Sequence, residues 1–348
     1  MARLFQRQIE VQITTLTPPF TTKVWSRNKI STTLNKSIER HSENTGTISI
    51  TNINQRETSL LASTTKPRQF IYALKAGYGD DLQLISEGHI EEITWRHEGG
   101  DVTVDFGINE AHKYSENPHA IIGVPTISKG SSIYHFITSI RSKFNKSAQR
   151  LNRENSDNEK ILNFEDYVFV GDREAIIKEL RESKLESNIT IEDFKKSLSE
   201  VLDSAGYSYY MENRKINIFK RPEESDTRFL RRKATDITNL NFETGLLNIS
   251  LENITDYQFQ AIKLSQIKFK SLFIPALIPF NIVDITEPKY PNLNSRYIIY
   301  NSKYSLNNKG EGGFYVECIA RDLQFFDPTL SKTVGQQILG KKRIGSSQ

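Results

Sequence analysis

Two segments far apart in this chain repeat one β pattern, and this repeat constrains the fold more than any other feature of the sequence. Each segment is a long strand, a glycine-rich turn and an alternating strand that ends in a polar pair. The first runs from Gly88 to Glu110, and the second runs from Arg296 to Asp322. A chain with two copies of a β unit presents two similar surfaces. Three such chains in a ring would offer six similar surfaces with only threefold symmetry.

The charges are unevenly distributed along the chain. Its 348 residues include 46 Lys and Arg and 42 Asp and Glu, a formal net charge of +4. Residues 1–330 are close to neutral, so no nucleic-acid-binding body is predicted and the excess lies in residues 331–348. This basic tail is expected to be flexible and to bind a partner, with a merely solvated terminus as the competing interpretation. Its cations are Lys332, Lys341, Lys342 and Arg343.

The hydrophobic pattern changes twice along the chain. Residues 1–115 alternate apolar and polar side chains, as in 9–14 and 47–52, and turn signals separate the runs. Several short strands of this kind indicate a first β-barrel domain. The same character returns in 223–330, which is predicted to be a second β-barrel domain. The predicted fold is therefore mainly β with an α+β insertion, in which two similar, tube-like β-barrel domains flank a small α+β domain.

Residues 116–222 form the predicted α+β insertion. A helix is expected after Ser132, because apolar residues follow at spacings of three and four and share one helix face. Residues 145–160 have no apolar period and are predicted to be a mobile loop. The apolar face consists of Ile133, Phe136, Ile137, Ile140 and Phe144.

The rest of the insertion carries local signals for two more helices and a hairpin. Asp172 is expected to cap one helix. Residues 190–193 resemble a capping box that opens the next, which is predicted to stop at Gly206. A hairpin is predicted over 207–219, with its turn at 212–214.

No motif in the sequence carries recognisable chemistry. The glycine-rich phosphate loops, the Gly-x-Ser-x-Gly elbow and the His-Glu-x-x-His motif are absent, so no catalytic residue and no cofactor are predicted. The spacings of the six histidines match no common ligand set, so no metal site is predicted, and exposed strand and turn positions are expected for them. The one cysteine, Cys318, is expected to be a buried core thiol.

Paired carboxylates could serve a glycosidase only if two of them converged in one cleft. Turn and surface roles are favoured over such an arrangement. The pairs are Asp80 and Asp81, Glu91 and Glu92, Glu165 and Asp166, and Glu223 and Glu224.

No segment has the properties of a membrane span. Residues 1–11 contain charges and no apolar core, so no signal peptide is predicted. The most apolar run, 272–283, is too short and is interrupted by two prolines. The chain is therefore expected to be soluble and to be made in a reducing cytoplasm.

The order of the predicted elements, together with several local sequences, resembles one known family. The segments are similar to the baseplate hub proteins of contractile-tailed bacteriophages, the family to which the Mu hub belongs. The resemblance covers about residues 5–330. The local sequences that carry it are the Gly77-Tyr78 turn, the strand start at 87–90, the helix start at 127–132, the helix–hairpin segment 202–218, and the segments 243–247, 277–283 and 304–318.

This resemblance implies a structural adaptor rather than an enzyme. Two barrels per chain would assemble as a homotrimer into a pseudo-sixfold ring that joins the sixfold tail tube to the threefold central spike. The implied partners are the tail tube protein, a separate central spike protein and other baseplate proteins, and DNA at most passes through the lumen. The implied location is the virion, in the phage tail baseplate, after synthesis in the host cytoplasm. The basic tail would be the arm for such a partner.

Two other functions remain open on the sequence alone. A β-rich hydrolase of cell-wall glycan would need a carboxylate pair in a cleft. A monomeric glycan-binding module would need a free groove lined by aromatic side chains.

Overall fold

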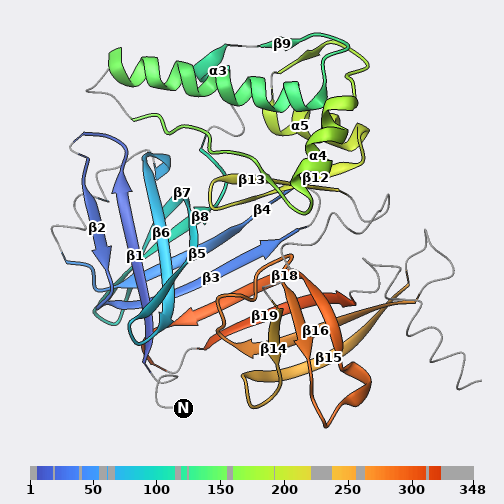
Figure 1. Ribbon diagram of the computed structural model, residues 1–348. Helices are drawn as coiled ribbons and strands as arrows, with labels where there is room; N and C mark the ends of the chain where they lie inside the picture. The colour runs from blue at the N-terminus through green and yellow to red at the C-terminus, as the bar shows by residue number, and fades with distance from the viewer. Residues whose placement is uncertain are drawn as a thin grey trace, which may run out of the picture.

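Among the described residues β-strands are the commonest element, and the helices α2 to α5 lie between His119 and Ser204 in the middle of the sequence. In Figure 1, the blue and orange strands lie below and the green and yellow insertion lies above them. The predicted fold class, mainly β with an α+β insertion, is confirmed. The computed structural model describes residues 6–18, 20–38, 41–54, 61, 67–113, 119–123, 125–154, 160–191, 193–220, 237–255, 263–310 and 313–322.

The first β region forms where apolar residues recur at every second position. In β3, Ile30, Thr32 and Leu34 are buried and alternate with more exposed residues, as expected for a strand with one face on the core. The strands of this region are β1 (Arg7–Thr15), β2 (Thr22–Trp25), β3 (Lys29–Ser37), β4 (Ser42–Glu43), β5 (Thr45–Thr51), β6 (Phe70–Tyr78), β7 (Asp81–Glu98) and β8 (Asp101–Asn109), with the 3-10 helix η2 (Pro67–Gln69) before β6.

The second β region completes one large sheet with the first. The order of this sheet is β15-β16-β19-β18-β3-β5-β8-β7-β6-β1-β2, and β17 pairs with both β18 and β14. One hydrophobic core cluster contains residues of both regions. The predicted domain limits at 115, 222 and 330 stay predictions. The elements of the second region are β14 (Ile237–Leu240), β15 (Leu246–Thr255), β16 (Lys263–Leu272), β17 (Ile282–Ile285), η5 (Pro291–Leu293), β18 (Ser295–Asn307) and β19 (Phe314–Asp322).

The insertion has a core of its own. Its helices α3, α4 and α5 pack their apolar faces on the hairpin β12–β13. The short strand β4 of the first β region pairs in parallel with β12 and ties the insertion to the sheet. The elements are α2 (His119–Ile122), β9 (Thr126–Ile127), α3 (Ile133–Glu154), β10 (Val168–Phe169), α4 (Arg173–Glu182), β11 (Ile189–Thr190), α5 (Phe194–Ser204), β12 (Tyr207–Glu212) and β13 (Lys215–Lys220).

Helix α3 continues through most of the predicted mobile loop 145–160, so that prediction is wrong for the helical part. The cause is a pair of asparagines that hold an extended segment against the helix. Asn145 donates to the carbonyl of Phe164 at 2.9 Å and accepts from its N–H at 2.8 Å. Asn152 makes the same pair of bonds with Ile161, at 2.8 and 2.9 Å. A polar stretch that looked unstructured therefore gains fixed hydrogen-bond partners.

The predicted helix caps are confirmed in part. The Asp172 side chain accepts hydrogen bonds from the first turn of α4. Helix α5 is capped by Asp193 and not by Thr190, because Thr190 belongs to β11 and its backbone is extended. Gly206 follows this helix with a φ of +75°, the left-handed conformation that glycine adopts most easily.

Cys318 is fully buried, as predicted, and burial raises the pKa of its thiol to about 12. We expect the native chain to react with iodoacetamide at pH 8 about a thousand times more slowly than the unfolded chain, because each pKa unit removes tenfold of the reactive thiolate. Mass spectrometry of the alkylated protein measures both rates. Comparable rates with and without denaturant would show that the thiol is accessible.

Candidate assembly interface

Both copies of the repeated β unit fold as long hairpins. β7 pairs with β8, and β18 pairs with β19, as the repeat predicted. Each hairpin contains one register shift, between Ile90 and Glu92 in the first and between Ile299 and Asn301 in the second. A bulge at the same place in both hairpins makes the two units structurally equivalent, since bulges bend a strand and change its neighbours.

Strand β18 changes its outer partner at this bulge. Before it, Ser295 to Ile298 pair with β17. After it, Asn301 to Asn307 pair antiparallel with β3 of the first β region. This junction between β18 and β3 is the backbone connection by which the two β regions form one sheet.

The core face of this junction is apolar and closed. Tyr304 lies opposite Leu34, and both side chains are buried. The hydroxyls of Tyr304 and Ser302 donate to the carbonyl of Leu277, at 3.0 and 2.7 Å. Because both hydroxyls have a hydrogen-bond partner, this part of the junction behaves as protein interior rather than as a loose contact.

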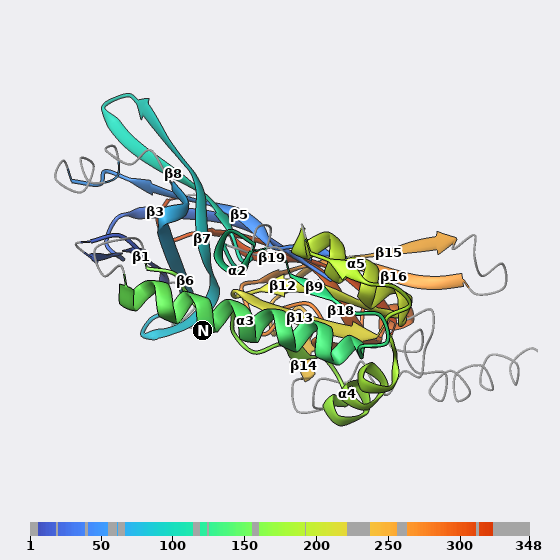
Figure 2. The ribbon, with the colours of Figure 1, turned by 90° about the horizontal axis from the view of Figure 1, so that it is seen from above.

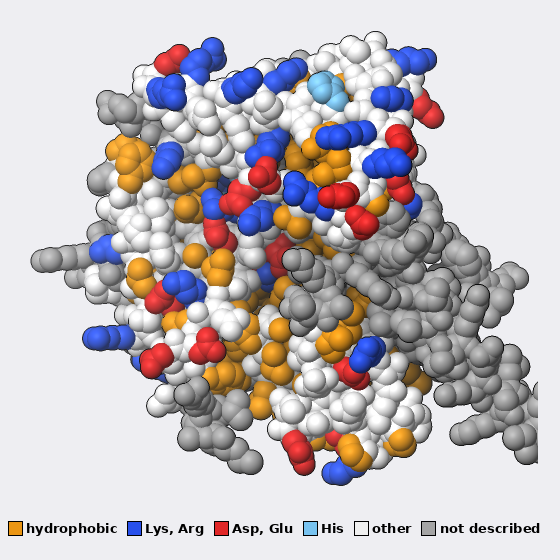
Figure 3. Space-filling model, viewed as in Figure 1, with side chains coloured by type: hydrophobic (Ala, Val, Ile, Leu, Met, Phe, Trp, Pro, Cys, Tyr) orange, Lys and Arg blue, Asp and Glu red, His pale blue; other side chains and the backbone are white. Residues whose placement is uncertain are grey.

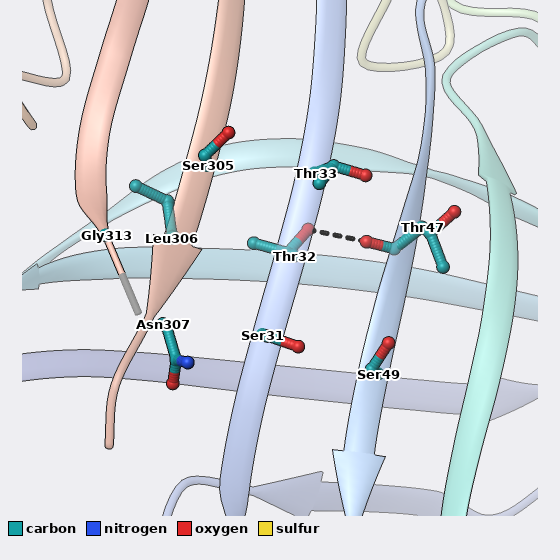
Figure 4. Close-up of a pocket in the computed structure, with 9 residues that line it drawn as sticks. All are labelled: Ser31, Thr32, Thr33, Thr47, Ser49, Ser305, Leu306, Asn307 and Gly313. Carbon is teal, nitrogen blue, oxygen red and sulfur yellow. Dashed lines mark hydrogen bonds between the residues drawn. The ribbon is translucent and has the colours of Figure 1, made fainter. Parts of the chain in front are cut away.

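The opposite face of the junction is a shallow polar groove of about 350 Å³ (Figure 4). Thr32 borders the groove although its side chain is buried on the core side, and its hydroxyl donates to the carbonyl of Thr47 at 2.9 Å and ties β3 to β5. The lining is uncharged, so the groove has no group that would bind a phosphate as an ion pair. Its residues are Ser31, Thr32, Thr33, Thr47, Ser49, Ser305, Leu306, Asn307 and Gly313.

Aromatic side chains form a second contact between the β regions. The Tyr78 ring, at the end of β6, packs edge-on against Phe314 with ring centroids 5.2 Å apart. Phe273 completes the cluster at 5.1 Å from Phe314. The Arg7 guanidinium lies over the Phe314 ring, 6.0 Å from its centroid. The cleft beside this cluster, about 630 Å³, is lined by Tyr78, Phe273, Asp80 and Asp81 among others.

Several strand edges of the sheet have no partner in the described ranges, among them those of β2, β14, β15 and the second half of β7. β6 pairs with β7 only from Asp81 to His89, so beyond the bulge the one described neighbour of β7 is β8. β15 pairs with β16 and has no other described neighbour. The hairpins β7–β8 and β15–β16, which carry two of these open edges, lie at opposite ends of the molecule (Figure 2).

The open edges of β7 and β15 carry apolar side chains on the face that continues the core. Ile93 and Trp95 of β7 pack partly against the main core. On β15, Leu251 lies opposite the buried Ile267, yet it is 47% exposed. Leu247 on the same strand is 46% exposed. An open edge with uncovered apolar groups is a template for pairing with another chain.

The predicted partner-binding residues Lys332, Lys341, Lys342 and Arg343 lie outside the described residues. On the face in Figure 3, Lys and Arg side chains are interspersed with Asp and Glu. No helix within the described residues is long and apolar enough to cross a membrane.

The histidines were predicted to be exposed, and for two of them this is wrong. His89 and His112 are 4% and 3% exposed. Their rings contact backbone carbonyls, His89 that of Ala111 at 2.9 Å and His112 that of Leu162 at 3.2 Å. They occupy core positions because a ring nitrogen can donate to a buried carbonyl. Among the described residues, no group of three or more His, Cys, Asp or Glu could hold a metal ion.

Of the carboxylate pairs noted in the sequence, Asp80 and Asp81 both line the cleft beside Tyr78. The neighbouring His89 ring, whose Nε2 lies 3.6 Å from the Glu91 carboxylate, is the main reason that the pKa of Glu91 is lowered to about 2, so Glu91 is unsuited to donate a proton. Burial raises the pKa of Glu110, but this side chain is 0% exposed and cannot reach a substrate. Glu223 and Glu224 lie outside the described residues.

The open edges were not found from the sequence, although a signal was present. β7 is twice as long as its partner β6, 18 against 9 residues, so half of it must lack that neighbour. Residues 247, 249 and 251 alternate as in a buried strand. Neither pattern says whether the missing neighbour belongs to the same chain.

Comparison with known proteins gives matches in structure alone, since no protein-family model and no curated protein matches the chain. The 43 kDa tail protein of prophage MuSo2 from Shewanella oneidensis is 8% identical, with a TM-score of 0.54 over 92% of this chain and 99% of that chain. The tail protein from Neisseria meningitidis MC58 is 9% identical, with a TM-score of 0.54 over 92% and 98%.

A third similar structure is an E. coli component of the type VI secretion system, described as structurally similar to the T4 bacteriophage tail proteins gp27 and gp5. It is 10% identical, with a TM-score of 0.50 over 85% of this chain and 73% of that chain. The likeness extends through both β regions and the insertion, since 92% of this chain is covered in the first two matches. The resemblance drawn from the sequence is thereby confirmed at the level of the fold, and the chain has the fold of phage tail proteins such as that of the Mu-like prophage.

Proposed function

We propose that this chain is a structural protein of a contractile phage tail, the baseplate hub. Three copies would form a pseudo-sixfold ring that joins the sixfold tail tube to the threefold central spike. Its partners would be two further copies, the tail tube protein, a separate spike protein and other baseplate proteins. DNA would at most pass through the lumen, and the basic tail 331–348 would be an arm for the spike. The protein would belong to the virion.

The observation that carries this proposal is the equivalence of the two β regions within a tail-protein fold. A sixfold tube needs six similar docking surfaces, and a threefold spike needs three identical ones. A chain with two equivalent hairpins provides both when three copies close a ring. Glu91 holds its charge and Glu110 is fully buried, so neither of these two carboxylates supports the glycan hydrolase over a structural role.

Solution mass by light scattering on a size-exclusion column tests this proposal. We expect about 120 kDa, three times the chain mass of 40.0 kDa, either for the chain alone or after addition of a candidate spike protein. A chain that stays at 40 kDa under both conditions would overturn the ring and favour the glycan-binding and hydrolase alternatives.

A further inference from the structure

The strands around the two hairpins follow the same order. In the first β region β3, β5, β8, β7 and β6 are successive neighbours, and in the second β15, β16, β19, β18 and β17 are. β3 therefore corresponds to β15, and β7 corresponds to β18. The residues skipped at the bulges, Glu91 and Tyr300, provide a fixed point from which both regions can be compared.

The paired rows then fix which residues correspond. Trp95 and Tyr304 lie equally far beyond their bulges and on the core face. Just before the bulge, paired residues form a row across the strands of each region. The last residue of this row is Leu34 in the first region and Leu251 in the second, so these two residues correspond. These rows are Ile90, Ile108, Gly46 and Leu34 in the first region, and Ile299, Ala320, Ile267 and Leu251 in the second.

Within one chain, β18 pairs with β3, and Tyr304 lies opposite Leu34. The corresponding strands β7 and β15 each have an open edge. We propose that β7 of one copy pairs antiparallel with β15 of the next copy, with Trp95 opposite Leu251. This inference rests on the proposed hub and specifies how its subunits join. The same register places His97 opposite Ile249.

The side chains at the edges of β7 and β15 are consistent with a second copy of the chain as the partner. In the joined pair, Tyr304 and Leu34 are 0% and 1% exposed, whereas Leu251 is 47% exposed. Pairing with the next copy would cover Leu251 with the Trp95 ring and satisfy the backbone groups of both edges. Because the edges lie at opposite ends of the molecule (Figure 2), the contact is head to tail and can close into a ring.

Cysteine cross-linking tests the register. Directly opposed residues in an antiparallel pair have Cβ atoms about 4.5–5.5 Å apart. The variant Trp95→Cys with Leu251→Cys should therefore give covalent trimers, with a mild oxidant or a short bifunctional thiol reagent, on a non-reducing gel. The native Cys318 is buried and leaves the background low. The matched control is Trp95→Cys with Ser250→Cys, whose new thiols point to opposite faces of the sheet.

A second variant tests the edge without cross-linking. Leu251→Arg places a charge in the proposed contact and should shift the mass from about 120 to 40 kDa. Leu84→Arg is its control, because Leu84 is also 47% exposed but lies on the part of β7 that pairs with β6. Both side chains are exposed in the single chain, so circular dichroism should show folded protein in both cases.

The outcomes separate this inference from the proposed function. Cross-linked trimers that form only in the Trp95 and Leu251 pair, with dissociation by Leu251→Arg alone, support the register. A trimer by mass that neither cross-links at this pair nor dissociates with Leu251→Arg overturns the register and leaves the hub in place. A mass of 40 kDa for the unmodified chain under both conditions overturns the hub and the register together.

Discussion

Replacing Lys36 with methionine is expected to destabilise the folded chain by about 3–5 kcal/mol, because it leaves buried carboxylates without their cation. The Lys36 ammonium lies 2.9 Å from Glu110 and 3.0 Å from Glu212. Lys36 and Glu110 are 1% and 0% exposed. Breaking such a pair from one side costs far more than the intact pair contributes, since the remaining charge is both desolvated and unpaired.

The protonation behaviour of the group points the same way. Burial alone would lower the pKa of Lys36, but the two carboxylates overcome it and hold the pKa above its ordinary value. Burial raises the pKa of Glu110, which also accepts a hydrogen bond from the Asn44 amide at 2.7 Å. In the Lys36→Met variant, Glu110 is expected to take up a proton, which limits the loss of stability to the lower part of the range.

The matched control is Lys75→Met, which breaks a lysine pair on an exposed face. Lys75 lies 2.9 Å from Glu10, and their side chains are 40% and 24% exposed. Loss of an exposed pair is expected to cost only about 0–1 kcal/mol. Urea titrations of both variants measure the difference, and equal effects would contradict the structural role of the buried group. Because Glu212 ends β12, this group also fastens the insertion to the sheet.

This buried group shows where prediction from sequence stops. Lys36, Glu110 and Glu212 are far apart in the chain, and each stands in a pattern that is typical of a solvated strand end. The pairing of β3 with β5 and of β5 with β8 brings Lys36 near Glu110, and the pairing of β4 with β12 adds Glu212. The repeat was predictable, because a strand, a turn and a strand are encoded locally.

The edges show a second limit of the same kind. Alternation along β15 correctly predicts a strand with one apolar face, but exposure depends on the neighbour that covers it. The prediction for the stretch after Asn145 was wrong for a related reason, because the residues that bind it, 161–164, follow later in the chain. Local periodicity therefore predicted the strands and helices, while their exposure and their partners depend on contacts between residues far apart in the chain.

Acid is expected to weaken the folded chain through His112, by roughly 3 kcal/mol between pH 7 and pH 4. Burial is the main reason that the pKa of His112 is lowered from 6.5 to about 3. Between these values the unfolded chain binds a proton that the folded chain does not. Stability therefore rises with pH across this window and is lost as pH falls through it.

The surroundings of His112 explain why the folded chain excludes the proton. Its ring stacks on Phe164 at 4.1 Å and meets the edge of Phe144 at 5.7 Å between centroids. Its Nε2–H donates to the Leu162 carbonyl at 3.2 Å. The neutral ring satisfies this apolar site, whereas an imidazolium would be a desolvated charge beside a nearby cation, Arg214.

His112→Asn removes the titrating group and should flatten this acid dependence. The variant loses the aromatic stack and is less stable at pH 7, but its disadvantage relative to the parent should shrink by roughly 3 kcal/mol at pH 4. Urea titrations at both pH values give this difference. His135→Asn, at an exposed position of α3, controls for the loss of one histidine. If the variant is less stable than the parent by the same free energy of unfolding at pH 7 and at pH 4, His112 is not the acid-sensitive group.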